Sequence, residues 1–97
     1  MTREDRLNAV RMMHAVMTSM NNENAYMAWI WVMPDEPSEE DFEYFADEIE
    51  FDELKQTFDR LFGKYKKDGL FEPSDEELSF LSEQGYLTDD IDIFRRH

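Results

Sequence analysis

The chain has 97 residues, 24 of them acidic and 10 basic, so its formal net charge is −14, and it contains no cysteine. The lack of cysteine excludes thiol catalysis, thiolate metal sites and disulfide bonds. Residues 1–33 hold three acids and three bases, which leaves 21 acids and seven bases in residues 34–97. A field of that sign repels nucleic acids and anionic membranes, so we expect no direct binding to either and a protein as partner.

Chain length predicts a single domain over residues 1–97. The first five residues, Met-Thr-Arg-Glu-Asp, lack the basic and then apolar pattern of a signal peptide. No apolar run reaches the ~18–20 residues that cross a bilayer. We therefore expect a cytoplasmic protein.

The first predicted helix begins after Thr2, a capping residue that is followed by two acids in the first turn. Apolar residues between Ala9 and Met20 recur on one side at helical spacing, the pattern of an amphipathic helix. The pair Asn21-Asn22 favours a turn and ends this helix.

The apolar run of residues 25–33 contains both tryptophans and is followed by Pro34. As a helix it places four large residues on one face, at i, i+3, i+4 and i+7: Tyr26, Trp29, Ile30 and Met33. Its β-favouring side chains also fit a buried strand, but the chain offers only short segments as partner strands. We predict a helix around which the other elements pack. An α+β fold with residues 25–33 as a strand is the alternative.

Trp31 and Met27 lie outside that face, because Trp31 is about 160° from Trp29 on a helix. One interpretation is that other helices cover both sides of the stretch and bury them, which is what we expect. The other is that both are exposed and anchor a partner. Trp31 and Met27 are therefore the candidate partner-binding residues.

The acidic half of the chain predicts three further elements. After the connector Pro34–Pro37, Ser38-Glu-Glu-Asp41 resembles a capping box and starts a short helix. We expect its apolar face to comprise Phe42, Phe45, Ala46 and Ile49. A break near residues 47–50 precedes a long helix over Phe51–Lys67, the main cover of the core, with Gly69 as its left-handed C-terminal residue. Its apolar stripe comprises Phe51, Leu54, Phe58, Leu61, Phe62 and Tyr65.

Near the C-terminus, Ser74-Asp-Glu-Glu77 is a full capping box, and Gly85 ends the helix that follows it. We expect Tyr86-Leu87 to pack back on the core. Residues 88–97 form either a last short helix or a loose extended tail. The fold class is thus all-α, a compact bundle of four or five short helices.

Few residues offer chemistry. His14 lies at the border of the polar side of the first helix, and His97 is the only other histidine. Neither forms part of a nucleophile–base–orienter pattern, so we expect no enzyme and no catalytic residue. The spacing Asp89-Asp90-x-Asp92 could hold Ca²⁺ weakly, but a helix start explains it better. No Gly-rich phosphate loop is present, and we expect no cofactor and no metal.

Two features of composition favour binding. Six of the seven methionines lie between Met12 and Met33 and suit either core filling, which we favour, or an adaptable groove. The acidity suits a nucleic-acid mimic that inhibits a DNA- or RNA-binding host protein. However, more than half of the acids fall in or next to predicted first helical turns, where helix dipoles account for them.

The segment Glu23-Asn-Ala-Tyr-Met-Ala-Trp-Ile, with the later Pro-Asp-Glu-Pro-Ser-Glu-Glu-Asp-Phe-Glu-Tyr, resembles small acidic proteins of unknown function from bacterial plasmids, prophages and integrative elements. The resemblance covers about half the chain and carries no catalytic motif. It implies an accessory or regulatory role in a mobile element. The function we expect is a non-enzymatic protein-interaction module, with self-association as one form of it and acidic mimicry as the alternative.

Overall fold

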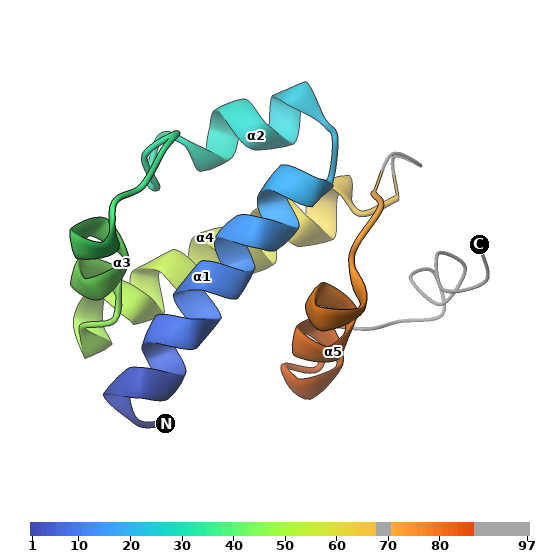
Figure 1. Cartoon of the computed structure of the whole chain (residues 1–97). Coiled ribbons are helices and arrows are strands. Elements are labelled where there is room, and N and C mark those ends of the chain that lie inside the picture. The colour runs from blue at the N-terminus through green and yellow to red at the C-terminus, as the bar shows by residue number, and fades with distance from the viewer. Residues whose placement is uncertain (68–70, 87–97) are drawn as a thin grey trace.

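The computed structural model describes residues 1–67 and 71–86, which form five α-helices and no strand (Figure 1). The helices are α1 (Arg3–Ser19), α2 (Glu23–Trp29), α3 (Glu39–Phe45), α4 (Glu48–Tyr65) and α5 (Asp75–Glu83). The prediction of an all-α bundle is therefore confirmed. The alternative with residues 25–33 as a strand is wrong, because α2 occupies the first part of that stretch.

Capping residues set the starts of the helices. Thr2, Ser38 and Ser74 each form a capping box with the acid three residues later. The boxes at Ser38 and Ser74 were predicted, whereas Thr2 was predicted only as a cap. Asn22 caps α2 by accepting a hydrogen bond from the backbone N–H of Ala25 at 3.1 Å. Each side chain satisfies a backbone N–H that has no partner within its own helix. Local sequence therefore determines where these helices begin.

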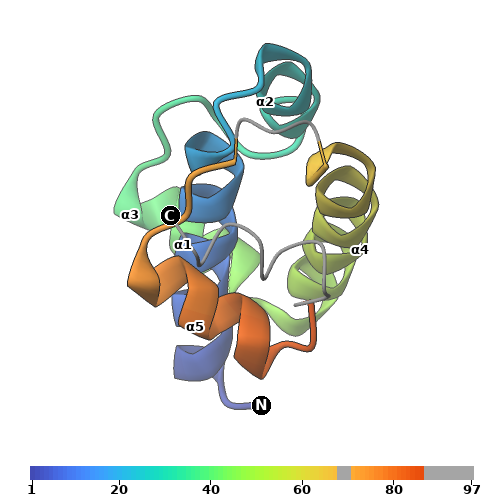
Figure 2. The same cartoon turned by 90° about the vertical axis from the view of Figure 1, so that its right-hand side faces the viewer.

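The helix α1 is the hub of the bundle, since it contacts each of the other four helices. This corrects the expectation that the apolar stretch 25–33 is the central element. α2 contacts only α1 and α4 among the described helices, and it lies at one end of the molecule, with α5 towards the other (Figures 1 and 2). The core forms where the apolar faces of α1 and α4 meet, and it includes Val10, Met13, Met17, Leu54, Phe58 and Phe62.

The long helix α4 carries the predicted stripe, whose residues are buried except for the partly buried Tyr65. The helix begins at Glu48, three residues earlier than expected, because Asp47 has extended backbone and caps the N–H of Ile49. This extended residue breaks the periodicity that runs from α3. Ile49 is therefore 69% exposed and does not share the apolar face of Phe42 and Phe45, as we had expected.

Arginines of α1 hold α3 in place. Arg6 Nε donates to the carbonyl of Ala46 at 2.7 Å, and an Arg3 guanidinium nitrogen donates to the carbonyl of Glu43 at 3.4 Å. Both carbonyls lie at the C-terminal end of α3, which has partial negative charge. Arg11 forms an ion pair with Glu39 and lies 6.0 Å from the ring centroid of Phe42. All three arginines of α1 are thus directed to α3.

Glu77 connects α5 to the end of α1. Its Oε1 accepts a hydrogen bond from Ser19 Oγ at 2.8 Å, and its Oε2 accepts one from the backbone N–H of Ser74 at 3.1 Å. Gly85 follows α5 with a φ of 80°, as predicted for the residue that ends the helix. Tyr86 then packs on the aromatic core, as expected, and its ring centroid lies 5.2 Å from that of Phe58. The predictions for Gly69, Leu87 and residues 88–97 fall outside the described residues.

Candidate functional site: an exposed tryptophan beside a buried one

Trp29 anchors α2 to the bundle. Its side chain is fully buried and meets the ring of Phe58 edge-to-face, with centroids 6.1 Å apart. Its indole Nε1–H donates to Nδ1 of His14 on α1 at 3.1 Å. A buried indole N–H needs such an acceptor, so this bond fixes both the position and the rotation of α2.

His14 has a structural role in this arrangement. It is half-buried, and its ring meets Phe42 edge-to-face at 6.0 Å. Burial lowers the pKa of His14, and the nearby negative charge of Asp35 opposes this shift only in part. Only the neutral imidazole has a ring nitrogen, here Nδ1, that can accept the hydrogen bond from the indole N–H. The border position was predicted from the sequence, but its bond to Trp29 was not, because no local pattern connects residues 15 positions apart.

The chain turns sharply after Trp29. Ile30 is the C-terminal cap of α2, and the backbone N–H groups of Val32 and Met33 both donate to the carbonyl of Trp29 at 3.0 Å. Met33 returns to the core and is fully buried. Trp31 lies in this turn, two residues from the fully buried Trp29 on one side and Met33 on the other.

Trp31 is 87% exposed, Met27 is 51% exposed and Val32 is 38% exposed. We call these three residues the Trp31 surface. The expectation that helices would bury Trp31 and Met27 is wrong, because α2 packs only against α1 and α4 and nothing in the described chain covers its third side. Trp29 is buried and Trp31 is exposed, but the two do not lie on opposite faces of one helix as predicted, because α2 ends at Trp29 and Trp31 lies in the turn that follows.

The electrostatic surroundings of the Trp31 surface are acidic. No Lys or Arg occurs between Arg11 and Lys55, whereas residues 12–54 contain twelve acids. Three of them, Glu23, Asp35 and Glu36, flank the surface along the chain and are exposed. A complementary partner therefore presents an apolar pocket bordered by basic side chains.

Two other large residues are exposed at the junction of α3 and α4. Tyr44 is 58% exposed and Ile49 is 69% exposed. A hydrogen bond with Glu50 raises the pKa of Tyr44. Tyr44 lacks the purely apolar character of the Trp31 surface and serves as a matched aromatic control for it.

The methionines mostly fill the core. Met13, Met17, Met20 and Met33 are buried, in agreement with the core-filling interpretation, and Met12 is partly buried against them. Met27 is the exception among these six. The exposed thioether of α2 thus belongs to the Trp31 surface.

Residues 1–67 and 71–86 contain no group of three or more His, Asp or Glu side chains placed to hold a metal ion. The Asp89-Asp90-x-Asp92 spacing lies outside these residues. Among the described helices, none is both long and apolar enough to cross a membrane.

Comparison with protein-family models, curated proteins and solved structures found no match to this chain.

Proposed function

We propose that the protein is a non-enzymatic interaction module that binds another protein through the Trp31 surface, in an accessory or regulatory role in a bacterial mobile element. The observation that carries the proposal is the 87% exposure of Trp31 on a turn whose neighbours Trp29 and Met33 are fully buried. The backbone that carries Trp31 is therefore held in place before it meets a partner, and little backbone entropy is lost on binding.

A tryptophan contributes strongly to binding energy. An aromatic side chain of this kind buries roughly 150–250 Å² at an interface. At ~25 cal/mol per Å², full burial corresponds to about 4–6 kcal/mol before the costs of association are subtracted. Tryptophan is also enriched among the interface residues whose loss weakens binding most. Met27 and Val32 add a flexible and a rigid apolar neighbour, respectively.

The charge distribution favours a different protein over a second copy of this chain. A symmetric dimer places the same surface patch on both subunits. The acids that flank Trp31 would then face each other without a Lys or Arg from residues 12–54 to neutralise them. Repulsion of this kind opposes self-association. A different protein, with basic side chains around its apolar pocket, is the better fit.

Acidic mimicry of nucleic acid is the second candidate function, and the net charge of −14 favours it. Eleven acids lie in the first turns of the five helices, two in α1, one in α2, three in α3, two in α4 and three in α5. These acids stabilise helix starts and are distributed over all elements. The two functions differ in their response to salt, because charge-driven binding collapses at high ionic strength and apolar docking does not.

The test is quantitative affinity capture from the native host with four forms of the protein: wild type, Trp31→Ala, Met27→Ala and Tyr44→Ala. We expect one or more proteins to be retained by wild type and by Tyr44→Ala at both 0.1 and 0.5 M salt (roughly 10 Å and under 5 Å screening lengths). Trp31→Ala should retain none of these proteins, and Met27→Ala should retain smaller amounts of them than wild type does. The purified partner should then bind wild type directly.

Other outcomes contradict the proposal. If capture survives Trp31→Ala but disappears in high salt and in the presence of DNA, mimicry replaces apolar docking. If sedimentation shows a wild-type dimer that Trp31→Ala dissociates, the Trp31 surface is a self-association site. Circular dichroism of each variant excludes loss of the fold as the cause.

A further inference from the structure

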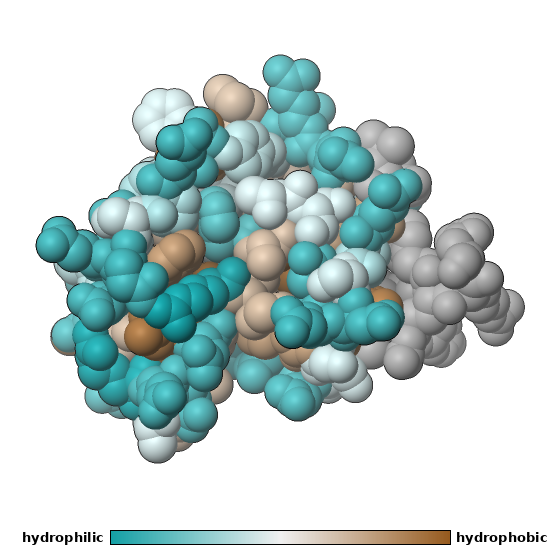
Figure 3. All heavy atoms as spheres, in the orientation of Figure 1, coloured by the Kyte–Doolittle hydropathy of each residue, from teal (hydrophilic) through white to brown (hydrophobic). Residues whose placement is uncertain are grey.

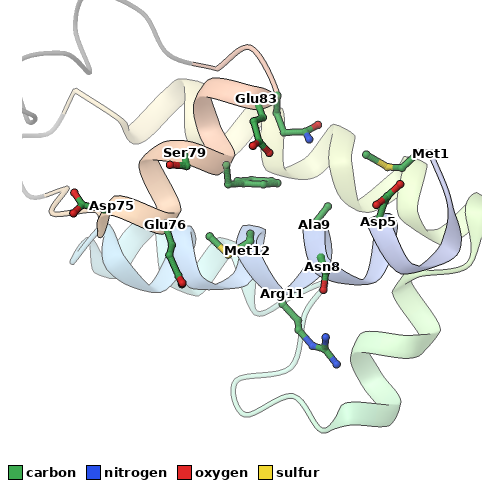
Figure 4. Close-up of a pocket in the computed structure, with 12 residues that line it drawn as sticks. Met1, Asp5, Asn8, Ala9, Arg11, Met12, Asp75, Glu76, Ser79 and Glu83 are labelled. Carbon is green, nitrogen blue, oxygen red and sulfur yellow. The ribbon is translucent and has the colours of Figure 1, made fainter.

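A groove of about 820 Å³ runs between α1 and α5, on a part of the molecule that does not include the Trp31 surface (Figure 4). Its apolar lining comprises Met1, Ala9, Met12 and Phe80. Ala9 and Met12 project from α1 towards α5, and Glu76 and Glu83 project from α5 towards α1 (Figure 4). In the space-filling view, apolar surface gathers in the hollow between the two helices and hydrophilic side chains surround it (Figure 3).

The charge around this groove is negative. Asp5 comes from α1, and Asp75, Glu76 and Glu83 come from α5. Arg11 is the one basic residue in the lining, and its guanidinium forms an ion pair with Glu39 and points away from α5 (Figure 4). Arg3 and Arg6 are bonded to α3 carbonyls on the other side of α1. The arginines of α1 therefore leave Glu76 and Glu83 without a cation from this helix, whereas the amino group of Met1 lies near Asp5.

The dimensions of the groove suit a helix. The wall formed by α5 from Asp75 to Glu83 has nine residues, whose first and last are about 12 Å apart along the axis at 1.5 Å per residue. That length accommodates two helical turns, which present apolar side chains at i, i+3 or i+4, and i+7 along one face. Met1 is 63% exposed and Met12 is partly buried, and flexible thioethers adapt to the shape of incoming side chains.

The geometry points to a second binding site in this protein: the α1–α5 groove takes a basic amphipathic helix of a partner protein. The apolar face of that helix lies on Ala9, Met12 and Phe80. Its Lys or Arg residues flank this face and meet the carboxylates of Glu76 and Glu83. This inference is independent of docking at the Trp31 surface, since Trp31 does not line the groove.

The test uses the full chain and a defined probe, a fluorescently labelled 18-residue peptide of leucine and lysine with leucines at helical spacing. A scrambled peptide of the same composition is the control for charge alone. Fluorescence anisotropy measures affinity, and circular dichroism measures helix formation. We expect the amphipathic peptide to bind at least tenfold tighter than the scrambled peptide and to gain helicity.

Two kinds of variant locate the site. Ser79→Arg places a bulky cation in the groove from an exposed position and should weaken peptide binding at least tenfold. The double variant Glu76→Gln/Glu83→Gln removes two carboxylates of the groove and should weaken binding several-fold, even if Ser79→Arg impairs folding. Asp52→Asn/Glu53→Gln is the matched control, since it removes two exposed carboxylates of α4 outside the groove. We expect this control to stay within twofold of wild type.

Several results would overturn the inference. Equal binding of both peptides, or equal weakening by the groove and control variants, would show attraction to the overall charge only. Loss of binding in Trp31→Ala would move the site to the Trp31 surface. Tighter binding in Phe94→Ala would assign the groove to residues 87–97 of this chain. A wild-type dimer that Ser79→Arg dissociates would assign it to a second copy.

Discussion

Replacing each tryptophan separately by phenylalanine tests the opposite environments of two residues that are only two positions apart. Trp29→Phe removes the indole N–H that donates to His14 and leaves a smaller ring in a fully buried site. The lost hydrogen bond contributes about 1 kcal/mol. The void adds about 1–2 kcal/mol, less than the 3–5 kcal/mol of a full truncation to alanine. We expect a loss of about 2–3 kcal/mol in the free energy of unfolding.

For a domain of this size, each kcal/mol shifts Tm by roughly 4–8 °C, so Trp29→Phe should lower Tm by about 8–24 °C. Trp31→Phe changes a side chain that is 87% exposed and should alter stability by less than about 0.5 kcal/mol. Thermal and urea denaturation followed by circular dichroism at the helix band measure both changes. The two variants are matched in chemistry, and only the environment of the residue differs.

Fluorescence provides an independent check with the same two proteins. Trp31→Phe leaves the buried Trp29, whose emission should be blue-shifted and protected from iodide. Trp29→Phe leaves Trp31, whose emission should resemble that of indole in water and be quenched readily. Equal Tm shifts, or equal quenching of the two remaining tryptophans, would refute the assignment of one residue to the core and the other to the surface.

Two further predictions concern stability. Gly63 lies inside α4 with open space where a Cβ would project, so Gly63→Ala should stabilise the protein by about 0.5–1 kcal/mol, whereas Gly85→Ala should destabilise it by about 1 kcal/mol because φ is 80° there. Urea denaturation measures the change in the free energy of unfolding for both variants. Changes of the same sign would contradict the claim that backbone conformation distinguishes the two glycines. Because burial lowers the pKa of His14 in the folded state, the stability from its neutral form is present above pH 6.5 and lost as pH falls below it. The free-energy difference between wild type and His14→Gln should therefore decrease from pH 7.5 to 5.5, and a constant difference would show that His14 does not titrate differently in the two states.

Local signals in the sequence accounted for the starts of three helices. The side chains of Thr2, Ser38 and Ser74 act within a few residues of themselves, so their capping boxes could be recognised without the fold. The stripe of α4 was equally predictable, because its residues share one face of a single helix. Ile49 shows the limit of such reasoning, since one extended residue at Asp47 was enough to change which way it points.

The candidate sites depended on contacts between distant segments. Periodicity separated Trp31 from Trp29 by assuming a helix through residue 33. It could not show that α2 ends at Trp29, nor which side of α2 another helix would cover. The buried side of α2 is set by α1, which contacts every other described helix, and by the hydrogen bond between Trp29 and His14. The α1–α5 groove was not predicted, because its acids looked like ordinary first-turn residues and its apolar lining looked like core.

The stretch without Lys or Arg between Arg11 and Lys55 has a practical consequence for work on the Trp31 surface. Trypsin cleaves after lysine and arginine, so digestion releases α2, α3 and the turn between them within one fragment spanning residues 12–55. The segment between Arg11 and Lys55 has no lysine that could react with an amine-directed cross-linker or be acetylated or ubiquitinated. Mapping a bound partner at this surface therefore calls for reagents that react with carboxylates, and for a protease that cleaves at acidic or aromatic residues.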